Sequence, residues 1–277
     1  MIMIEFYKLS GSGNDFILID NMDGSLQVGD PGAFAKSVCK RKVSVGADGL
    51  IIIEPSDKVD FRWLFFNADG SEPEMCGNGG RCAARFAFLR KIAKKRMSFE
   101  TLAGTIDAVV KADSVKIRLS VPHSLVMEDK IMVNGKNLVV HSINTGVPHV
   151  VHFVNDLKNF NVFTTGRAIR LHEHYQPAGT NANFVAVADT HAIHVRTYER
   201  GVEDETLACG TGSVASALIA SRKRLVESPV DVHVQSGETL KIYFEQTKDG
   251  FADVYLEGKV TVVYRGNLWD EAWMKGE

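Results

Sequence analysis

The chain has 277 residues, 45% hydrophobic and 24% charged, and a formal net charge of -2. This composition is that of a globular protein, and it excludes a disordered chain or one with enough basic charge to bind nucleic acid. The sequence contains no run of about eighteen apolar residues and no basic-then-apolar leader, so we expect a cytoplasmic protein without a membrane or nucleic-acid partner.

Short alternating or β-branched segments recur along the chain and predict strands. The expected strands of the first half lie at 4–10, 49–54, 59–66 and 104–112, followed by a hairpin turn at Ala112–Asp113 into 113–121. A second strand-rich series runs from 125 to 154. The later expected strands are ANFVAVA, HAIHVRTYE, VDVHVQS, TLKIYFEQ and ADVYLEG.

Four segments are helical in pattern, at 31–41, 76–92, 163–173 and 208–224. The second and fourth are rich in Ala, Leu and Phe almost all round. A helix with no polar face is typically buried at the centre of a domain. We therefore expect each of these two helices to form the core of one half of the protein.

Those two helices are preceded by similar sequences, FFNADGSEPEMCGNGG at 65–80 and TYERGVEDETLACGTGS at 197–213. Each leads from an aromatic strand end through an acidic turn into Cys-Gly-polar-Gly. This repeat predicts an α+β fold of two similar domains from an internal duplication, 1–122 and 123–277, with the boundary near Pro122. Each domain would be a mixed, largely antiparallel sheet or barrel wrapped around its helix, with an active site in the cleft between them.

The repeat places one cysteine, Cys76 or Cys209, at the start of each apolar helix. A thiol there faces unpaired backbone N–H groups and the positive end of the helix dipole, which lower its pKa from about 8.5 toward roughly 3.5 to 7.5. The glycine that follows leaves room for a carboxylate to reach those N–H groups. One such motif often holds only a buried structural cysteine, but two copies with matching flanks indicate a pair of acid–base groups.

Two thiols facing one carbon from opposite sides define a reaction. One, as thiolate, removes the α-proton of an amino acid, and the other, as thiol, delivers a proton to the opposite face, so the centre is inverted. This chemistry needs no cofactor and no metal. The other cysteines, Cys39 and Cys82, lack these flanks, and we expect Cys82 to be a core residue. The pair His172 and His174 has helical spacing that points the two rings apart and does not predict a metal site.

Five ordered motifs give the chain a close resemblance to the diaminopimelate epimerase family over nearly its whole length. They are SGSGNDFILID at 10–20, FFNADGSEPEMCGNGGRCAARF at 65–86, NTGVPHVV at 144–151, PAGTNANFV at 177–185 and ERGVEDETLACGTGSVASA at 199–217. The resemblance implies a cofactor-independent isomerase that interconverts LL- and meso-diaminopimelate in the synthesis of lysine and peptidoglycan precursors.

The resemblance also implies roles for individual residues. Cys76 and Cys209 would be the acid–base pair, with His149 as a supporting residue near the reacting centre. Glu199 and the main chain at Arg200 would receive the α-ammonium group. The remaining implied substrate-binding residues are the helix starts Gly77, Asn78, Gly210 and Thr211, and, for the distal end of the substrate, Asn14, Asn67, Asn181 and the Arg200 guanidinium.

Three positions depart from the pattern of the family. Val147 stands where many members have Asn, Gly49 stands where some have a substrate-contacting Gln, and Lys259–Val260 replaces a usual Pro-Ala. Val147 and Gly49 leave open a two-cysteine racemase of another amino acid, and a non-catalytic amino-acid binding module with the same duplicated fold is a further alternative. The resemblance further implies a homodimer, for which Tyr264 is a candidate contact.

Overall fold

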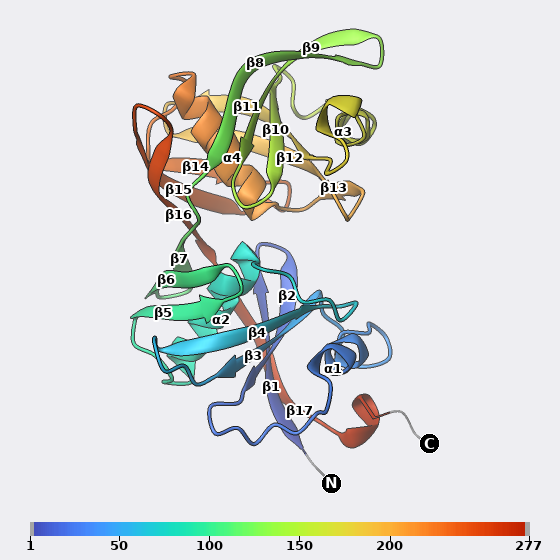
Figure 1. Ribbon diagram of the computed structural model, residues 1–277, viewed down its shortest axis with the longest axis vertical. Coiled ribbons are helices and arrows are strands. Elements are labelled where there is room, and N and C mark those ends of the chain that lie inside the picture. Colours follow the sequence, from blue (N-terminus) through green and yellow to red (C-terminus); the bar gives the residue numbers. More distant parts are fainter. Residues whose placement is uncertain (1–2, 275–277) are drawn as a thin grey trace. The chain divides into compact units, whose positions relative to one another are not determined.

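The computed structural model describes residues 3–274 and divides into two compact units (Figure 1). Unit 1 comprises Met1–Ile117 together with Gly258–Glu277, and unit 2 is the continuous segment Arg118–Glu257. The division expected from the sequence, at residue 122, lies close to the first crossing between the units. It does not anticipate the second crossing, which returns the end of the chain to unit 1.

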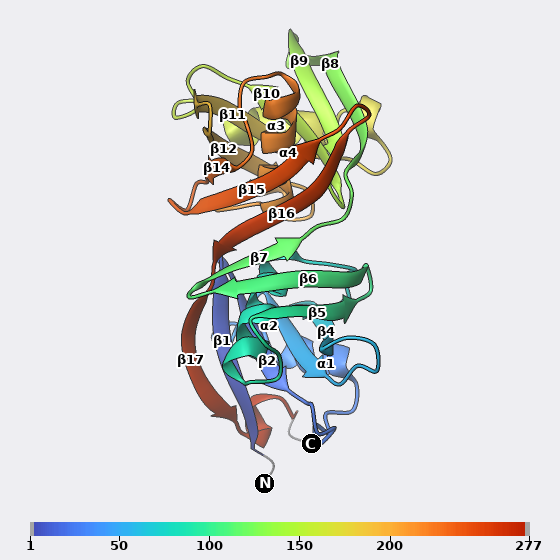
Figure 2. The same cartoon turned by 90° about the vertical axis from the view of Figure 1, so that its left-hand side faces the viewer.

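Unit 1 contains a curled mixed sheet in which β1 pairs on one side with the returning C-terminal strand β17 (Figure 2). From that edge the strands follow in the order β17, β1, β2, β3, β4, β5, β6 and β7, with parallel pairs only at β2–β3 and β4–β5. The strands are β1 (Ile4–Gly11), β2 (Asn14–Asp20), β3 (Gly49–Glu54), β4 (Phe61–Asn67), β5 (Arg96–Thr101), β6 (Gly104–Lys111), β7 (Ser114–Arg118) and β17 (Thr261–Leu268).

The helix α2 (Gly77–Leu89) lies inside this curled sheet, against β1, β2, β3 and β6. Its alanines and its Cys82 are buried on every side, which confirms the prediction of a central helix. A second, shorter helix, α1 (Pro31–Val38), packs on β3 and β4 from the other face of the sheet. The run Leu50–Ile53 of β3 is apolar throughout because it is buried between these two helices.

Unit 2 repeats this arrangement. Its strands follow in the order β8, β9, β10, β11, β12, β14, β15 and β16, with parallel pairs only at β10–β11 and β12–β14, and with the short β13 beside β12. The strands are β8 (His123–Val133), β9 (Lys136–Asn144), β10 (Pro148–Phe153), β11 (Asn181–Asp189), β12 (Ala192–Glu199), β13 (Asp204–Thr206), β14 (Val230–His233), β15 (Thr239–Gln246) and β16 (Phe251–Lys259).

The helix α4 (Gly210–Arg222) is the counterpart of α2, and α3 (Val162–Arg170) is the counterpart of α1. The small residues of α4 are almost all buried, and the helix contacts β9, β10, β11, β12, β14 and β15. Within residues 3–274, no helix combines the length and the apolar content that crossing a bilayer requires. Two 3₁₀ turns complete the structure, η1 (Glu173–Tyr175) and η2 (Asp270–Ala272).

The same succession of parallel and antiparallel pairs in both units agrees with the internal duplication expected from the sequence. The strand registers equate individual positions, because the pair Phe16–Gly49 corresponds to the pair His149–Asn181. By the same register, the pair Ile51–Phe65 of unit 1 corresponds to the pair Asn183–Thr197 of unit 2.

Candidate active site

Each of the two predicted cysteines is the N-cap of a central helix. Cys76 precedes α2 and Cys209 precedes α4, and both have extended backbone angles. The Sγ atom of Cys76 accepts a hydrogen bond of 3.4 Å from the backbone N–H of Gly79. Both sulfurs therefore lie where a helix N-terminus favours negative charge, as the sequence predicts.

The other two cysteines lie in different surroundings. Cys39 and Cys82 are both fully buried. Burial raises the pKa of Cys39 to about 12 and also raises the pKa of Cys82, because a thiolate in an apolar interior loses its hydration. These two thiols stay protonated at neutral pH, and the expected core position of Cys82 is confirmed.

In unit 1, the side chain of Asn78 in the first turn of α2 is held on both sides. Its Nδ2 donates to Asn14 Oδ1 at 2.6 Å, and its Oδ1 accepts from Arg81 at 2.9 Å. The fully buried Arg81 guanidinium also donates to Ser12 Oγ at 2.8 Å. The loop between β1 and β2 is thereby tied to the helix that begins after Cys76.

Asn14 is oriented in turn by a charged cluster. Its Nδ2 donates to Asp48 Oδ2 at 3.1 Å, and Arg41 bridges Asp48 and Asp15. Burial opposes ionisation of Asp15, but hydrogen bonds from Arg41 and Lys8 hold its pKa below the usual value. The cluster fixes the Asn14 amide beside Asn78. Asn67, at the end of β4, is instead hydrogen-bonded to Ser71 within its own turn.

In unit 2, the buried side chain of His149 lies next to the start of α4. Its Nε2 is 2.9 Å from Thr211 Oγ1, which is 3.6 Å from Cys209 Sγ. Burial, aided by the charge of Arg200, lowers the pKa of His149 to about 3. The imidazole is therefore neutral at physiological pH and contributes hydrogen bonds rather than a positive charge.

Glu199, at the end of β12, lies beside the same thiol. Burial raises the pKa of Glu199, and hydrogen bonds to its carboxylate from Thr206 and Cys209 partly offset that rise. The Thr206 hydroxyl donates at 3.0 Å. The Glu199 carboxylate is therefore a buried hydrogen-bond partner of the Cys209 thiol.

Asn181 and Arg200 form a second connection between β11 and the turn after β12. The Arg200 N–H donates to Asn181 Oδ1 at 2.8 Å, and Asn181 Nδ2 donates to the carbonyl of Pro148 at 3.2 Å. The Arg200 guanidinium donates to the carbonyl of Ala178 at 2.7 Å. The structure therefore places His149 and Glu199 beside Thr211 and Cys209, and it links Asn181 with Arg200.

Two of the positions that depart from the family pattern can be placed in unit 1 and unit 2. A Cβ at Gly49 would lie 2.8 Å from the carbonyl oxygen of Phe66 and 2.7 Å from the ring of Phe65, so the strand has no room for a longer side chain there. Val147 contributes its carbonyl, which accepts from the N–H of Thr145 at 3.2 Å. A side chain as long as glutamine at position 49 does not fit on this backbone.

Sequence reasoning did not identify Thr145, Asn183, Thr197 or Thr206 as part of the site. The Thr145 hydroxyl donates to the carbonyl of Thr211, and Thr197 and Asn183 lie behind His149. A signal was available in NANF at the start of β11, because Asn181 and Asn183 alternate with apolar residues on a strand that is buried on both faces.

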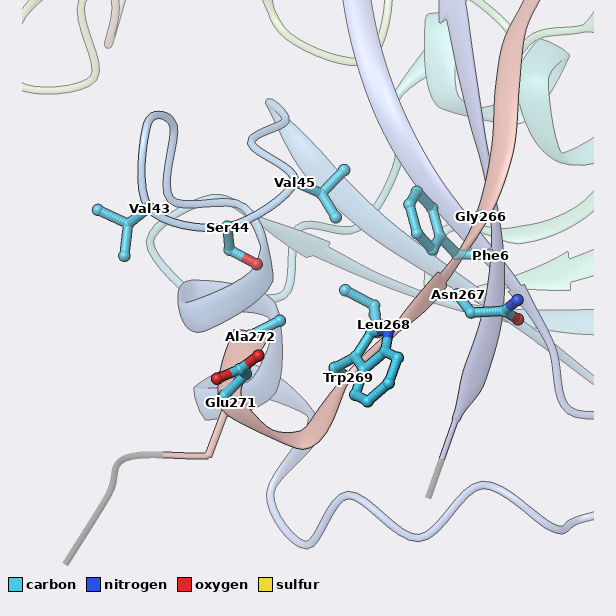
Figure 3. Close-up of a pocket in the computed structure, with 10 residues that line it drawn as sticks. All are labelled: Phe6, Val43, Ser44, Val45, Gly266, Asn267, Leu268, Trp269, Glu271 and Ala272. Atoms are coloured by element: carbon cyan, nitrogen blue, oxygen red, sulfur yellow. The ribbon is translucent and has the colours of Figure 1, made fainter. Parts of the chain in front are cut away.

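Neither the His172–His174 pair nor a hollow on unit 1 involves the two thiols. His172 and His174 belong to the exposed turn around η1, and His174 pairs with Asp129 at 3.1 Å. A hollow of about 680 Å³ lies on unit 1 between β1, the loop after α1 and the C-terminal segment (Figure 3). Apolar groups and backbone make up most of its lining, and no residue from the first turn of α2 or α4 belongs to it.

Comparison with known proteins identifies the family. The family model described as diaminopimelate epimerase matches residues 6–124 and 141–263. A diaminopimelate epimerase of Aquifex aeolicus is 48% identical, covering 97% of this chain and 99% of its own length.

Two solved structures share the fold. A PhzF-family phenazine biosynthesis protein of Bacillus anthracis has a TM-score of 0.74 at 15% identity, covering 97% of this chain and 100% of its own. A probable proline racemase of Agrobacterium radiobacter has a TM-score of 0.71 at 12% identity, with 98% of each chain covered. Because the family model spans most of both halves and the relatives match at high identity along almost the entire length, the chain belongs to the diaminopimelate epimerase family.

Proposed function

We propose that this chain interconverts LL- and meso-diaminopimelate without a cofactor, with Cys76 and Cys209 as the two proton-transfer groups. The observation that carries the proposal is the pair of cysteine N-caps on the two duplicated central helices of a chain that belongs to this family. An isomerase of this kind supplies a step in the synthesis of lysine and of peptidoglycan precursors.

The reaction begins with a thiolate. In unit 2, the Glu199 carboxylate shares a hydrogen bond with Cys209, and Thr211 Oγ1 lies 3.6 Å from the sulfur. In unit 1, the Gly79 N–H supplies the corresponding donor to Cys76. One sulfur removes the α-proton and the other, as thiol, protonates the opposite face of the same carbon.

The difficult step is the formation of negative charge on the α-carbon and its carboxylate. The N–H groups of the first helical turns, at Gly77 and Asn78 and at Gly210 and Thr211, are preorganised donors for that charge. The space at Gly77 is open, since the nearest atom to a built Cβ there is 4.0 Å away. A substrate carboxylate can therefore approach the backbone.

The remaining residues would recognise the amino-acid groups of the substrate. Glu199 and the main chain at Arg200 would receive the α-ammonium, while Asn14, Asn67, Asn181 and the Arg200 guanidinium would bind the distal end. Planar guanidinium and amide groups are matched to a carboxylate. The orientation of the Asn14 and Asn181 amides by Asp48 and Pro148 supports this assignment.

The test is isotope exchange. Incubation of the enzyme with LL-diaminopimelate in deuterated water is expected to give meso product carrying deuterium at the inverted α-carbon, because the second thiol delivers a solvent-exchanged proton. Inversion without solvent label would contradict a two-base mechanism. Equal turnover of proline or another mono-amino acid would show instead that the distal carboxylate is not recognised.

We also propose a cytoplasmic homodimer that uses the exposed side of β17. Tyr264 on this strand is 45% exposed, and its ring packs edge-on against Phe6 at 5.8 Å. The neighbouring Val262 and Val263 are also exposed, so β17 presents apolar side chains to solvent. Light scattering should show that the native protein is a dimer and that the Tyr264→Glu variant is a monomer. A native protein that is itself monomeric would contradict the proposal.

A further inference from the structure

A continuous chain of buried polar groups leads from the middle of the unit 2 sheet to Cys209. The hydroxyl of Thr197 donates to Asn183 Oδ1 at 2.9 Å, and Asn183 Nδ2 is 3.2 Å from His149 Nδ1. His149 Nε2 contacts Thr211 Oγ1, the neighbour of the sulfur. Thr197, Asn183 and His149 are each at most 3% exposed, so the directions of the hydrogen bonds among these three residues are set within the protein, while Thr211 at the end of the chain is half-buried.

The orientation of the Asn183 amide follows from its partners. The carbonyl oxygen of Val150 lies 2.9 Å from Nδ2 and can only accept, which identifies this end of the amide as the NH₂ group. The Thr197 hydroxyl donates to the other end. The second hydrogen of the NH₂ group therefore points at His149 Nδ1, which must be unprotonated to accept it.

This orientation selects one tautomer of the neutral imidazole. With Nδ1 as acceptor, His149 carries its proton on Nε2 and donates it to Thr211 Oγ1. The hydroxyl hydrogen of Thr211 is then available to the Cys209 sulfur at 3.6 Å. In the opposite tautomer, Thr211 would donate to the imidazole, and the sulfur could only donate to Thr211 as a thiol.

The corresponding positions of unit 1 are apolar. Asn183 corresponds to Ile51, Thr197 to Phe65 and His149 to Phe16. Equivalent glycines of the two central helices show the same difference. A Cβ added at Gly79 of α2 would meet Ile51, whereas a Cβ added at Gly212 of α4 would meet Asn183. A polar chain at these positions is therefore a property of the Cys209 half alone and is not required by the duplicated fold.

We propose that Asn183 is a positioning residue for the epimerisation, which holds His149 in the Nε2–H tautomer so that Thr211 donates its hydroxyl hydrogen to the Cys209 thiolate. This role rests on the proposed function. It makes the two thiols unequal, because the relay Asn183–His149–Thr211 leads to Cys209 and can be reversed by a substitution, whereas a backbone N–H donates to Cys76.

Other charged groups also face this relay. Glu199 on β12 shares a hydrogen bond with Cys209, and Arg200 in the following turn acts on His149. Neither contacts Asn183, whose hydrogen-bond partners are His149, Val150 and Thr197. A change at Asn183 therefore reaches the sulfur through the hydrogen bonds of the relay and leaves both charges in place.

The test uses NMR of the unliganded full chain, with ¹⁵N-labelled histidine and ¹³Cβ-labelled cysteine. The wild type is expected to show His149 as the Nε2–H tautomer. In Asn183→Leu the tautomers should mix, and the thiolate-to-thiol ratio of Cys209 at a fixed pH should fall about tenfold, as expected for the loss of a hydrogen bond to a charged group. Cys76, in the same sample, should titrate as in the wild type.

A double-mutant cycle separates relay from packing. Thr211→Val removes the hydroxyl, so adding Asn183→Leu to it should change the Cys209 titration no further. Thr197→Val, a smaller change, should shift the tautomer and the titration in the same direction and gives a second measurement should Asn183→Leu not fold. His141→Asn, which alters a buried histidine of unit 2 outside the relay, should leave Cys209 unchanged.

Two results would overturn the proposal: an Nδ1–H tautomer of His149 in the wild type, or an equal shift of Cys209 from Asn183→Leu with and without Thr211. Both measurements are made without substrate. A chain that showed the relay and failed to exchange deuterium into diaminopimelate would refute the proposed function and leave the relay standing.

Discussion

Burial gives chemically identical side chains different states in this protein. Cys39 is a protonated core residue whose pKa is raised to about 12, whereas Cys76 and Cys209 cap helices and face hydrogen-bond donors. Histidine shows the same effect, because the buried His149 is neutral across the physiological range. Position in the fold, and not residue type, selects the groups that can exchange protons.

Serine substitution at either helix-capping cysteine should slow proton transfer strongly. A serine hydroxyl is far less acidic than a thiol, so we expect Cys76→Ser and Cys209→Ser to lower kcat about 10²- to 10⁴-fold, as for the loss of a general acid or base. Binding of diaminopimelate, measured by calorimetry, should change little. Cys39→Ala is the matched control, since this cysteine is buried in the core cluster beneath α1. A serine variant with a near-normal rate would contradict the assignment.

The buried imidazole of His149 should make the protein sensitive to acid. Its pKa is about 3 in the folded state against an ordinary value of 6.5, so the unfolded chain binds a proton first as the pH falls. The contribution of the neutral, buried imidazole to the unfolding free energy is therefore fully present above pH 6.5. This contribution is lost as the pH falls from about 6.5 to 3. His149→Gln cannot titrate, and its unfolding free energy in urea should fall less steeply, by about 2 kcal/mol between pH 6.5 and 4.5. Parallel curves for the two proteins would contradict this origin.

The relay residues were missed for a geometric reason. Cys76 and Cys209 belong to local motifs that can be read along the sequence, with the cap and the glycine adjacent. Asn183 and Thr197 become neighbours only through the register of β11 with β12, which alternation alone does not specify. Their role depends on a third strand, β10, which carries His149.

At the scale of elements, all four helices were predicted close to their observed bounds, since their composition and starts are distinctive. Strand β17 was not predicted, because TVVYRGNL lacks a clear alternation of apolar and polar residues. The strand is set by its pairing with β1, a partner from the other end of the chain. Pairings over such sequence distances are specified by tertiary packing more than by local propensity.

The seating of α4 on β11 leaves no space at Gly212. A Cβ there would lie 2.3 Å from Asn183 Oδ1, whereas the equivalent Cβ at Gly79 on α2 would be in ordinary contact with Ile51 at 3.4 Å. We expect Gly212→Ala to lose about 1–3 kcal/mol of unfolding free energy through overpacking, and Gly79→Ala to lose less than about 1 kcal/mol. Urea denaturation of the two variants measures the difference; equal losses would show that α4 can shift on the sheet.

At the scale of the whole molecule, the duplication is uneven. Unit 2 is one continuous segment, while unit 1 is assembled from both ends of the chain. Strand β17 takes the place beside β1 that β8 takes beside β9. The sequence repeat indicated the two halves but not the position of β17 in unit 1. The repeat lies in the residues around the helix starts and does not include the edge strands.

This unevenness predicts which part folds alone. A fragment of residues 118–259 contains every strand of unit 2 and should give a dispersed NMR spectrum and a cooperative melting transition. The fragment 1–117 lacks β17, so β1 loses its partner and Leu268 leaves the core cluster beneath α1. It should stay aggregated or molten until a peptide of residues 258–274 is added. A cooperative melt of 1–117 alone would refute this dependence.

The return of β17 to β1 also sets an order of events at the ribosome. The nascent chain presents every residue of unit 2 before the strand that completes unit 1 has been translated. The part of the protein that is synthesised first is therefore the part that matures last. A chaperone bound to the unpaired edge of β1 would protect that edge from aggregation while the remaining residues are translated.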